Sequence, residues 1–507
     1  MEESTTFSFF GRSRLLTWGV VIALFVSGIG LRMINLTNPP LDFHAWRQLR
    51  AATIARGFFY QWSPRADPQL RDQAVELASH FEILEPRIFE RIVAFTYVLI
   101  GQEVLWAARL YAILFWGVGG VGVYLLAKQM TSIDGAIVAL AAYLFVPYGV
   151  VASRSFQPDP FMVVWVIWSA YAIYRWSEVH IWKWAILAGF CSGMAILIKV
   201  FAVYPVSMAV LLIVLTTEPI RKIIKDAQAW TVAALMVIIP AMYYILQVGN
   251  LAGGYLSGWV VAFSNLLIQP RFYVRWLVFL HSLLDLTLIL AGLLAVFLLP
   301  KRGRALMIGL WMGYFLIGLS VPSLIITHDY YNLVLIPILA LSLAPLGQLF
   351  LNKLIVQPKI WQVLCVCIAV AGLVFIGWLK RNEFVSQDYH EEIKGWVKIG
   401  RELPKDGSII GISQDYNTRL EYYGWRFISP WPTAIDQQMN VLAGGNSDMM
   451  DPVWKQIFLD KTKGYTYFLV TNFDELEQQP VLKEILSEYT YQDESGYRLY
   501  NLKQKQP

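Results

Sequence analysis

Long apolar runs recur along most of this chain, and they constrain its fold more than any other feature. A helix needs about 20 apolar residues to cross the hydrocarbon core of a bilayer, and the first run, Leu15 to Leu36, meets that length. Applied along the chain, the same criterion predicts about eleven membrane-spanning helices. They lie near residues 15–36, 104–127, 134–151, 160–176, 182–198, 201–217, 229–247, 276–299, 305–326, 333–351 and 360–379.

The composition agrees with a polytopic α-helical membrane protein. Only 15% of the residues are charged, whereas soluble proteins carry roughly a quarter. The net charge of +5 is small and comes mainly from predicted inner loops, so we expect no nucleic-acid partner. The three cysteines lie inside apolar runs and predict neither a disulfide nor a zinc framework. The first run is too long for a signal-peptide core and is expected to remain as a helix.

The distribution of lysine and arginine predicts the orientation in the membrane. Short cytoplasmic loops are enriched in these residues. With the amino terminus inside, every predicted inner loop is basic, as in Lys301 to Arg304. An odd number of crossings then places everything after Lys380 outside. We therefore expect a multi-pass protein of the plasma (inner) membrane with a cytoplasmic amino terminus and an extracytoplasmic carboxyl-terminal domain.

Two modules are expected. Residues 1–380 form a transmembrane module, whose first outer loop, 37–103, contains helical apolar spacing and predicts helices lying on the membrane surface. A further outer loop near 249–275 begins Gly-rich and ends aromatic and basic. Residues 381–507 alternate strand and helix patterns and predict a small extracytoplasmic α/β domain.

The segment that follows the first apolar run is unusually polar. Its sequence, "LDFHAWRQLR", is explained either as an ordinary interfacial segment or as one wall of a site at the membrane surface. Six residues make up this polar cluster: Asp42, His44, Trp46, Arg47, Gln48 and Arg50.

A second polar group lies in the short connection "SRSFQPDPF". Asp159 stands between two prolines where a helix re-enters the membrane, so it could simply cap that helix. Arg154 lies in the same connection, however, and charges beside apolar helices are costly and often mark a functional site. Both interpretations remain open at this point.

Further charged and aromatic residues occur at other outer helix ends. Lys199 closes one helix and is either a lysine that snorkels to the headgroups or a cation that meets a phosphate. Arg271 and Arg275 could do the same or anchor to anionic headgroups. The turn "THDYYN" contains tyrosines of the kind found in an interfacial aromatic belt and a His–Asp pair that could hold a metal or orient a phosphate. Its residues are His328, Asp329, Tyr330 and Tyr331.

All of these groups fall on the outer boundary in the topology derived from loop charge. Acids and cations that converge there fit an anionic lipid headgroup together with acid–base chemistry on its cargo. A lipid-phosphate-linked substrate would need such a set. The set comprises Asp42, His44, Arg47, Glu85, Arg154, Asp159, Lys199, Arg271, His328 and Asp329.

The long outer loop, "SRSFQPDPFMVVW", the helix-end Lys199 and "HDYYNLVLIPILALSLA" resemble the GT-C superfamily of membrane glycosyltransferases. More narrowly, they resemble its bacterial branch related to protein O-mannosyltransferases and the lipid A aminoarabinose transferase. The resemblance covers most of residues 1–350. It implies transfer of a monosaccharide from a polyprenyl-phosphate donor at the extracytoplasmic face, usually with inversion, to a glycan, lipid or protein acceptor.

The resemblance also implies roles for individual residues. An acid of the first outer loop serves as base or positions the substrates, an acid at the Asp159 position supports it, and a loop glutamate corresponding loosely to Glu85 binds a divalent metal in some relatives. Where relatives often have an adjacent Asp–Glu pair, this chain has Asp42 and His44. The base is therefore Asp42, His44 or Asp159, with Asp159 as the preferred essential acid. The lipid phosphate and the sugar are assigned to Arg47, Gln48, Arg154, Lys199, Arg271, His328, Asp329, Tyr330 and Tyr331.

Two other functions make different predictions. A transporter or flippase of lipid-linked saccharides predicts ionisable residues at mid-bilayer depth and discontinuous helices, whereas the charges here lie at one boundary. A non-catalytic envelope scaffold predicts that the outer acids can be neutralised without loss of function.

Overall fold

The computed structural model describes residues 8–83, 85–217, 219–248, 256–442 and 453–506, and its chain forms two compact units. The first unit comprises Met1–Leu36, Ile83–Ile88 and Ala108–Ser386. The second comprises Thr37–Glu82, Phe89–Ala107 and Gln387–Pro507. The predicted outer loop near 249–275 lies partly, at 249–255, outside the described residues.

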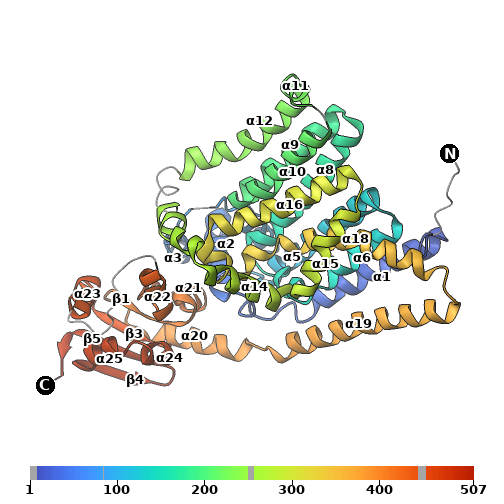
Figure 1. Ribbon diagram of the computed structural model, residues 1–507. Coiled ribbons are helices and arrows are strands. Elements are labelled where there is room, and N and C mark those ends of the chain that lie inside the picture. Colours follow the sequence, from blue (N-terminus) through green and yellow to red (C-terminus); the bar gives the residue numbers. More distant parts are fainter. Residues whose placement is uncertain (1–7, 84, 218, 249–255, 443–452, 507) are drawn as a thin grey trace. The chain divides into compact units, whose positions relative to one another are not determined.

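The first unit is built of α-helices joined by short turns (Figure 1). Its longer helices are α1 (Arg14–Met33), α5 (Trp106–Met130), α6 (Ile133–Phe145), α8 (Pro158–Val179), α9 (Trp182–Ile198), α10 (Val203–Thr217), α12 (Ala227–Tyr243), α14 (Pro270–Leu284), α15 (Leu286–Ala295), α16 (Lys301–Ser320), α18 (Leu335–Leu354) and α19 (Lys359–Ser386). The shorter α7 (Pro147–Ala152) and α17 (Pro322–Ile325) lie in the turns after α6 and α16.

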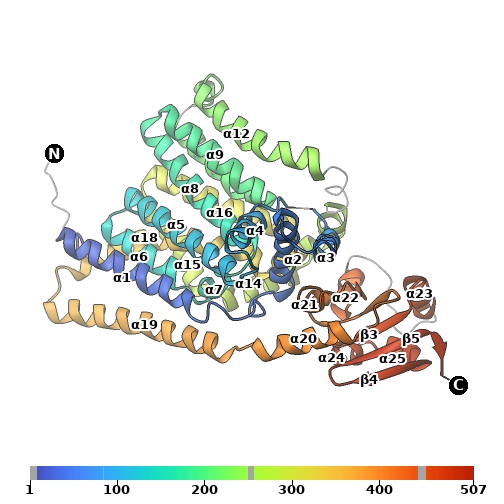
Figure 2. The same cartoon turned by 180° about the vertical axis from the view of Figure 1, so that it is seen from behind.

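Small residues let these helices pack closely. Helix α9 lies between α8 and α12 (Figure 2). Helix α10 runs along α16. A methyl group added at Gly313 of α16 would lie 2.2 Å from the Cα of Pro205 in α10. Glycine at such a contact allows two backbones to approach each other, which is how helices commonly associate in membranes. The α10–α16 contact holds in place the turn that precedes α10.

The predicted apolar segments are helical, but they do not all form long straight spans. Among the described residues, seven helices are long and apolar enough to cross a membrane, or eight if one bent pair counts as one. Helices α6 and α9 are shorter, with 13 and 17 residues. The expected single helix at 276–299 is wrong, because α14 and α15 meet at an angle of 93°. Asp285 makes this break with φ 62° and caps α15 by accepting from the Thr287 amide.

The second unit joins the first outer loop to the carboxyl-terminal residues. The loop supplies α2 (Ala45–Trp62), α3 (Pro68–Ser79) and α4 (Ile88–Ile100). The carboxyl-terminal part supplies α20 (His390–Glu402), α21 (Thr418–Tyr423), α22 (Ala434–Leu442), α23 (Val453–Thr462), α24 (Phe473–Glu477) and α25 (Pro480–Ser487). The loop was assigned above to the transmembrane module, whereas by its contacts it groups with the tail.

Arg56 of α2 explains this grouping. Its guanidinium forms an ion pair with Glu103 at 2.9 Å and donates to the carbonyl of Tyr422 at 2.6 Å. The same group lies 3.9 Å from the ring of Tyr422 and 4.2 Å from that of Trp425. Tyr422 in turn donates its hydroxyl to Glu103 at 3.0 Å. A buried arginine with both a carboxylate and aromatic faces is strongly held, so α2 is fixed against α21.

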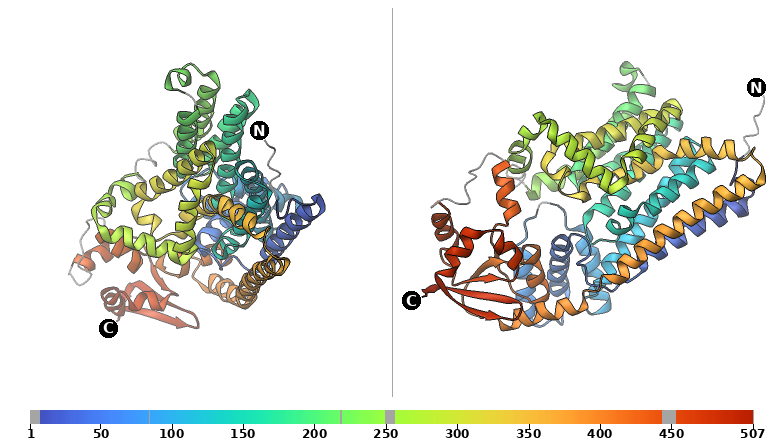
Figure 3. Two further views of the ribbon diagram at one scale, coloured as in Figure 1. Left: turned by 45° about the vertical axis from the view of Figure 1, so that its right-hand side comes forward. Right: turned by 60° about the horizontal axis from the view of Figure 1, so that its bottom comes forward.

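The tail contains the predicted α/β domain. In the described residues its sheet has five strands in the order β2-β1-β3-β5-β4. Figure 3 shows the ribbon of this tail in orange and red, with arrows for the strands, next to the carboxyl terminus. They are β1 (Ile409–Ile412), β2 (Ser429–Pro430), β3 (Tyr467–Val470), β4 (Tyr489–Glu494) and β5 (Tyr497–Lys505). Strand β1 is parallel to β2 and β3, whereas β5 is antiparallel to β3 and β4.

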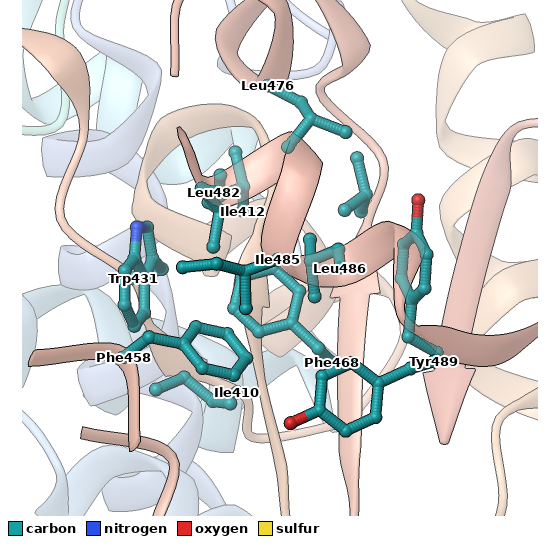
Figure 4. Packing of buried hydrophobic residues seen from close by; sticks show 12 residues of the cluster. Ile410, Ile412, Trp431, Phe458, Phe468, Leu476, Leu482, Ile485, Leu486 and Tyr489 are labelled. Carbon is teal, nitrogen blue, oxygen red and sulfur yellow. The ribbon is translucent and has the colours of Figure 1, made fainter. Parts of the chain in front are cut away.

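Helices cover both faces of this sheet, because alternate strand residues are apolar on each side. On one face Phe468 and Val470 pack with Trp431, Phe458 and residues of α25 (Figure 4). On the other face Leu469 packs with Trp396 and Ile399 of α20 and with Leu420 of α21. These two cores hold the ends of the parallel strands in fixed positions.

Candidate functional site

Asp159 is buried at the start of α8. The helix begins at Pro158 after an extended Gln157, and Gln157 makes no side-chain cap. Asp159 lies in the first turn and is fully buried. Its Oδ1 accepts from the ammonium of Lys199 at 2.5 Å. The interpretation of Asp159 as a helix cap is therefore wrong, since the carboxylate is paired with a cation from another helix end.

Lys199 reaches this carboxylate because the backbone changes direction after α9. The residue itself is extended, with φ −151° and ψ 116°, and its amide still donates to the carbonyl of Ala195. A short 3-10 turn, η1 (Val200–Ala202), then leads into α10. The side chain is 3% exposed. A snorkelling lysine keeps its ammonium in water, so the interpretation of Lys199 as a snorkelling residue is also wrong.

Two tyrosines cover the ammonium. Lys199 Nζ lies 4.3 Å from the ring centroid of Tyr331 and 4.8 Å from that of Tyr330. Both rings belong to the 3-10 turn η6 (Asp329–Asn332), and Phe201 packs edge-on against Tyr331 at 5.4 Å. An aromatic face attracts a cation most strongly where water is excluded. The two tyrosines of "THDYYN" therefore lie against Lys199.

A chain of buried hydrogen bonds holds this turn. Asn332 accepts from the Tyr314 hydroxyl at 2.5 Å and donates to the carbonyl of Ile325 at 3.2 Å. Trp276 donates to the Tyr314 oxygen at 3.2 Å, and Tyr148 donates to the carbonyl of Asp329 at 2.7 Å. Sequence reasoning missed Tyr148, Trp276, Tyr314 and Asn332. The available signal was the polar Asn332 in the turn "THDYYN", directly before the apolar run that continues into α18.

These groups surround a small cavity. Its volume is about 10 Å³, which is room for about one water molecule. Its lining consists of Asp159, Met162, Lys199, Phe201, Ala202, Pro205, Ile317, Tyr330, Tyr331 and Val334. In such surroundings an unpaired charge is very costly, so each member of the Asp159–Lys199 pair depends on the other. The arrangement can present a fixed cation under aromatic cover.

The other residues predicted for unit one have different surroundings. Arg154 donates to the carbonyls of Ile34 and Asn35 at 2.8 and 3.1 Å and lies over the ring of Phe384. It therefore closes the end of α1. His328 Nδ1 lies 2.8 Å from Thr327 Oγ1. The side chains of His328, Asp329 and Arg271 are absent from the described lining of the cavity.

The predicted residues of the first outer loop belong to the second unit. Gln48, which is buried, donates to Asp42 Oδ1 at 3.2 Å and to the carbonyl of Phe43 at 2.8 Å. His44 occupies the cap position of α2 in a left-handed conformation, φ 47°. The guanidinium of Arg47 lies 5.7 Å from the ring of Trp46. Asp42, His44 and Gln48 are therefore neighbours at one helix start.

Glu85 was assigned above to a divalent metal. It lies in the segment Ile83–Ile88 of the first unit and is half-buried. The part of the chain that the structure describes contains no group of three or more His, Cys, Asp or Glu residues placed to hold an ion. Because Mg²⁺ is often held by one or two carboxylates together with substrate phosphates, the assignment of Glu85 to a divalent metal stays a prediction.

Part of the chain matches the model of a known protein family. Residues 85–244 match the family model for dolichyl-phosphate-mannose-protein mannosyltransferase. No curated protein sequence matches the chain significantly.

Solved structures match over nearly its whole length. ArnT from Cupriavidus metallidurans, bound to undecaprenyl phosphate, shares 15% identity at a TM-score of 0.52, covering 96% of this chain and 97% of that one. The Archaeoglobus fulgidus oligosaccharyltransferase, tethered to an acceptor peptide, shares 12% identity at a TM-score of 0.56, covering 96% of this chain and 74% of that one. AglB from the same organism, in complex with an inhibitory peptide and a dolichol-phosphate, shares 11% identity at a TM-score of 0.56, with the same coverage.

The chain therefore has the fold of the GT-C glycosyltransferases, a multi-pass membrane architecture with a smaller carboxyl-terminal domain, and the resemblance seen in the sequence is confirmed at this level. Within that fold it is similar to ArnT along almost the full length of both chains.

Proposed function

We propose that this protein transfers a monosaccharide from a polyprenyl-phosphate donor to an acceptor at the extracytoplasmic membrane face. The observation that carries the proposal is the buried Asp159–Lys199 pair beneath Tyr330 and Tyr331. The fold also supports the proposal. ArnT and AglB have similar folds, and their structures contain undecaprenyl phosphate and a dolichol-phosphate, respectively.

Lys199 is assigned to the phosphate of the donor. The bond from the sugar C1 to the phosphate oxygen breaks during transfer, and negative charge develops on that leaving group. A preformed cation in a water-poor site stabilises such charge effectively. The ammonium of Lys199 donates to Asp159 Oδ1 at 2.5 Å. The pairing fixes where the ammonium points.

Asp159 is assigned a positioning role through Lys199. Asp159 was one of the three candidate bases, but its Oδ1 lies 2.5 Å from the Lys199 ammonium, and this charge-assisted contact assigns it to holding that cation. Asp42 or His44 then remains as the general base. In this scheme the acceptor hydroxyl attacks C1 opposite the phosphate, its proton passes to the base, and polyprenyl phosphate leaves. A single displacement of this kind inverts the anomeric centre.

The test is transfer by purified protein in lipid nanodiscs. A panel of labelled polyprenyl-phosphate sugars is offered together with water as acceptor, and release of polyprenyl phosphate is measured. We expect Asp159→Asn and Lys199→Met to lower release by at least about a hundredfold, in the range found for removing one group that stabilises transition-state charge. Glu178→Gln, which alters an ion pair with Arg175 at another helix end, is the matched control.

Unchanged release in both site variants would refute the assignment of the pair. Movement of intact lipid-linked sugar between leaflets, with no cleavage in the wild type, would instead support a transporter. The plasma-membrane orientation with an extracytoplasmic tail is part of the same proposal. It predicts that a tag after Lys505 is labelled from outside the cell, and labelling only after permeabilisation would contradict it.

A further inference from the structure

The α/β domain contains a topological switch point. From β1 the chain passes through α21 to β2 on one side of β1, whereas β3 pairs on the other side. Both neighbours are parallel to β1. In open parallel sheets, ligands bind outside the carboxyl ends of strands where the connections diverge in this way. A ligand site in this domain is therefore expected at the segments that follow β1 and β3.

Polar side chains link these two segments. Thr471, after β3, lies 2.8 Å from the hydroxyl of Ser413 and donates to Gln414 Oε1 at 2.7 Å. Farther along, the Tyr416 hydroxyl donates to Asp436 Oδ1 at 3.1 Å. The second oxygen of Asp436 accepts from the amide of Thr433 at 2.9 Å. The strand ends thus present hydroxyls, amides and one carboxylate held in fixed directions.

The backbone after β1 is strained. Asp415, Tyr416 and Asn417 have φ values of 51°, 54° and 70° in succession. Residues with a Cβ avoid this left-handed region, and three in a row without a glycine are unusual. Strain of this kind persists where the surrounding structure imposes it, commonly at binding sites. Here the strained backbone holds Tyr416 just after the carboxyl end of β1, where the residue is 41% exposed.

An aromatic partner comes from the first outer loop. The ring of Trp46, in the first turn of α2, meets the Tyr416 ring edge-on with centroids 6.0 Å apart. Trp46 follows His44, which is itself left-handed at φ 47°. The segment that contains His44 and the segment that contains Tyr416 are therefore in contact through the Trp46–Tyr416 pair. Both segments lie in the second unit.

We infer that the strand ends of β1 and β3, together with Trp46 and Tyr416, bind a saccharide acceptor. A sugar ring has an apolar C–H face and a rim of hydroxyls. Aromatic rings with polar neighbours suit such a ligand, because the rings cover the apolar face while the carboxylate and amides bond the hydroxyls. The inference rests on the proposed function, since it names the class of acceptor and places it beside the helix start that contains Asp42 and His44.

The experiment measures binding of the full-length protein in nanodiscs to an array of immobilised oligosaccharides. The main variant is Tyr416→Gly, because glycine adopts φ 54° without steric cost and so removes the ring while keeping the backbone. Tyr416→Phe keeps the ring and loses the hydroxyl. Tyr491→Ala removes another exposed tyrosine of the same domain, on β4, and is the matched control.

We expect the wild type to bind at least one saccharide, Tyr416→Gly to lose about tenfold in affinity, Tyr416→Phe to retain most of it, and Tyr491→Ala to be unchanged. No saccharide bound by the wild type, or equal binding by Tyr416→Gly, overturns the inference. Release of sugar from the donor to water is measured on the same samples. Donor cleavage without saccharide binding rejects the inference alone, whereas saccharide binding without any donor cleavage rejects the proposed function.

Discussion

Removing one member of the Asp159–Lys199 pair should destabilise the first unit more than removing both. The two side chains are 0% and 3% exposed and 2.5 Å apart. Breaking a buried pair of this kind typically costs about 3–5 kcal/mol, because the remaining charge has lost its partner, whereas replacing both charges by groups of similar size is often nearly neutral. Lys199→Met and Asp159→Asn should each lower stability by that amount, and the double variant should regain most of it.

The assay is equilibrium unfolding of the four proteins in mixed micelles, read as a double-mutant cycle. We expect a coupling energy on the order of 3 kcal/mol or more. Polyprenyl phosphate release should be lost in all three variants, so the double variant separates the structural role from the chemical one. Losses that simply add, with a double variant as unstable as the sum of the singles, would refute the argument that the two charges compensate each other.

Three other outcomes are expected. Asn332→Leu should raise the KM for the donor at least severalfold, because the turn that holds Tyr330 and Tyr331 loses its bonds to Tyr314 and Ile325; an unchanged KM contradicts this. Arg56→Met should speed amide exchange in α2 and α21 together, since it removes the ion pair and both ring contacts, and exchange rising in α2 alone would speak against that link. Burial raises the pKa of Glu421 from 4.5 to about 8. The folded state thus keeps a proton that the unfolded chain loses, so the stability of α21 should fall as pH rises from about 4.5 to 8; amide exchange across that range should show it, and Glu421→Gln should abolish the dependence.

The membrane architecture and the α/β tail could be predicted because they depend on patterns that are local in sequence. Apolar runs of spanning length, and short apolar runs such as Phe468 to Val470, are visible without any tertiary information. The break at Asp285 could not be read in the same way. The break results from the positive φ of a single residue within an apolar run. The spacing of apolar residues does not indicate the angle between the helices before and after that residue.

The site was predicted as a set of residues and not as an arrangement. Asp159 and Lys199 are 40 positions apart, and their pairing follows from how α8 and α9 pack. An arginine such as Arg154 is a chemically suitable ligand for phosphate, but its guanidinium donates to the carbonyls of Ile34 and Asn35 just after α1. Arg56 and Tyr422 are 366 positions apart, so no local pattern indicates that the first loop and the tail form one unit.

The central claim is that Lys199, fixed by Asp159, holds the phosphate of a lipid-linked donor. It is tested most directly by native mass spectrometry of the purified protein titrated with undecaprenyl phosphate. The account predicts binding by the wild type, a loss of at least about tenfold in Lys199→Met, as expected for one buried charge-assisted contact, and a smaller loss in Lys199→Arg. Equal affinity in the wild type and Lys199→Met would contradict it.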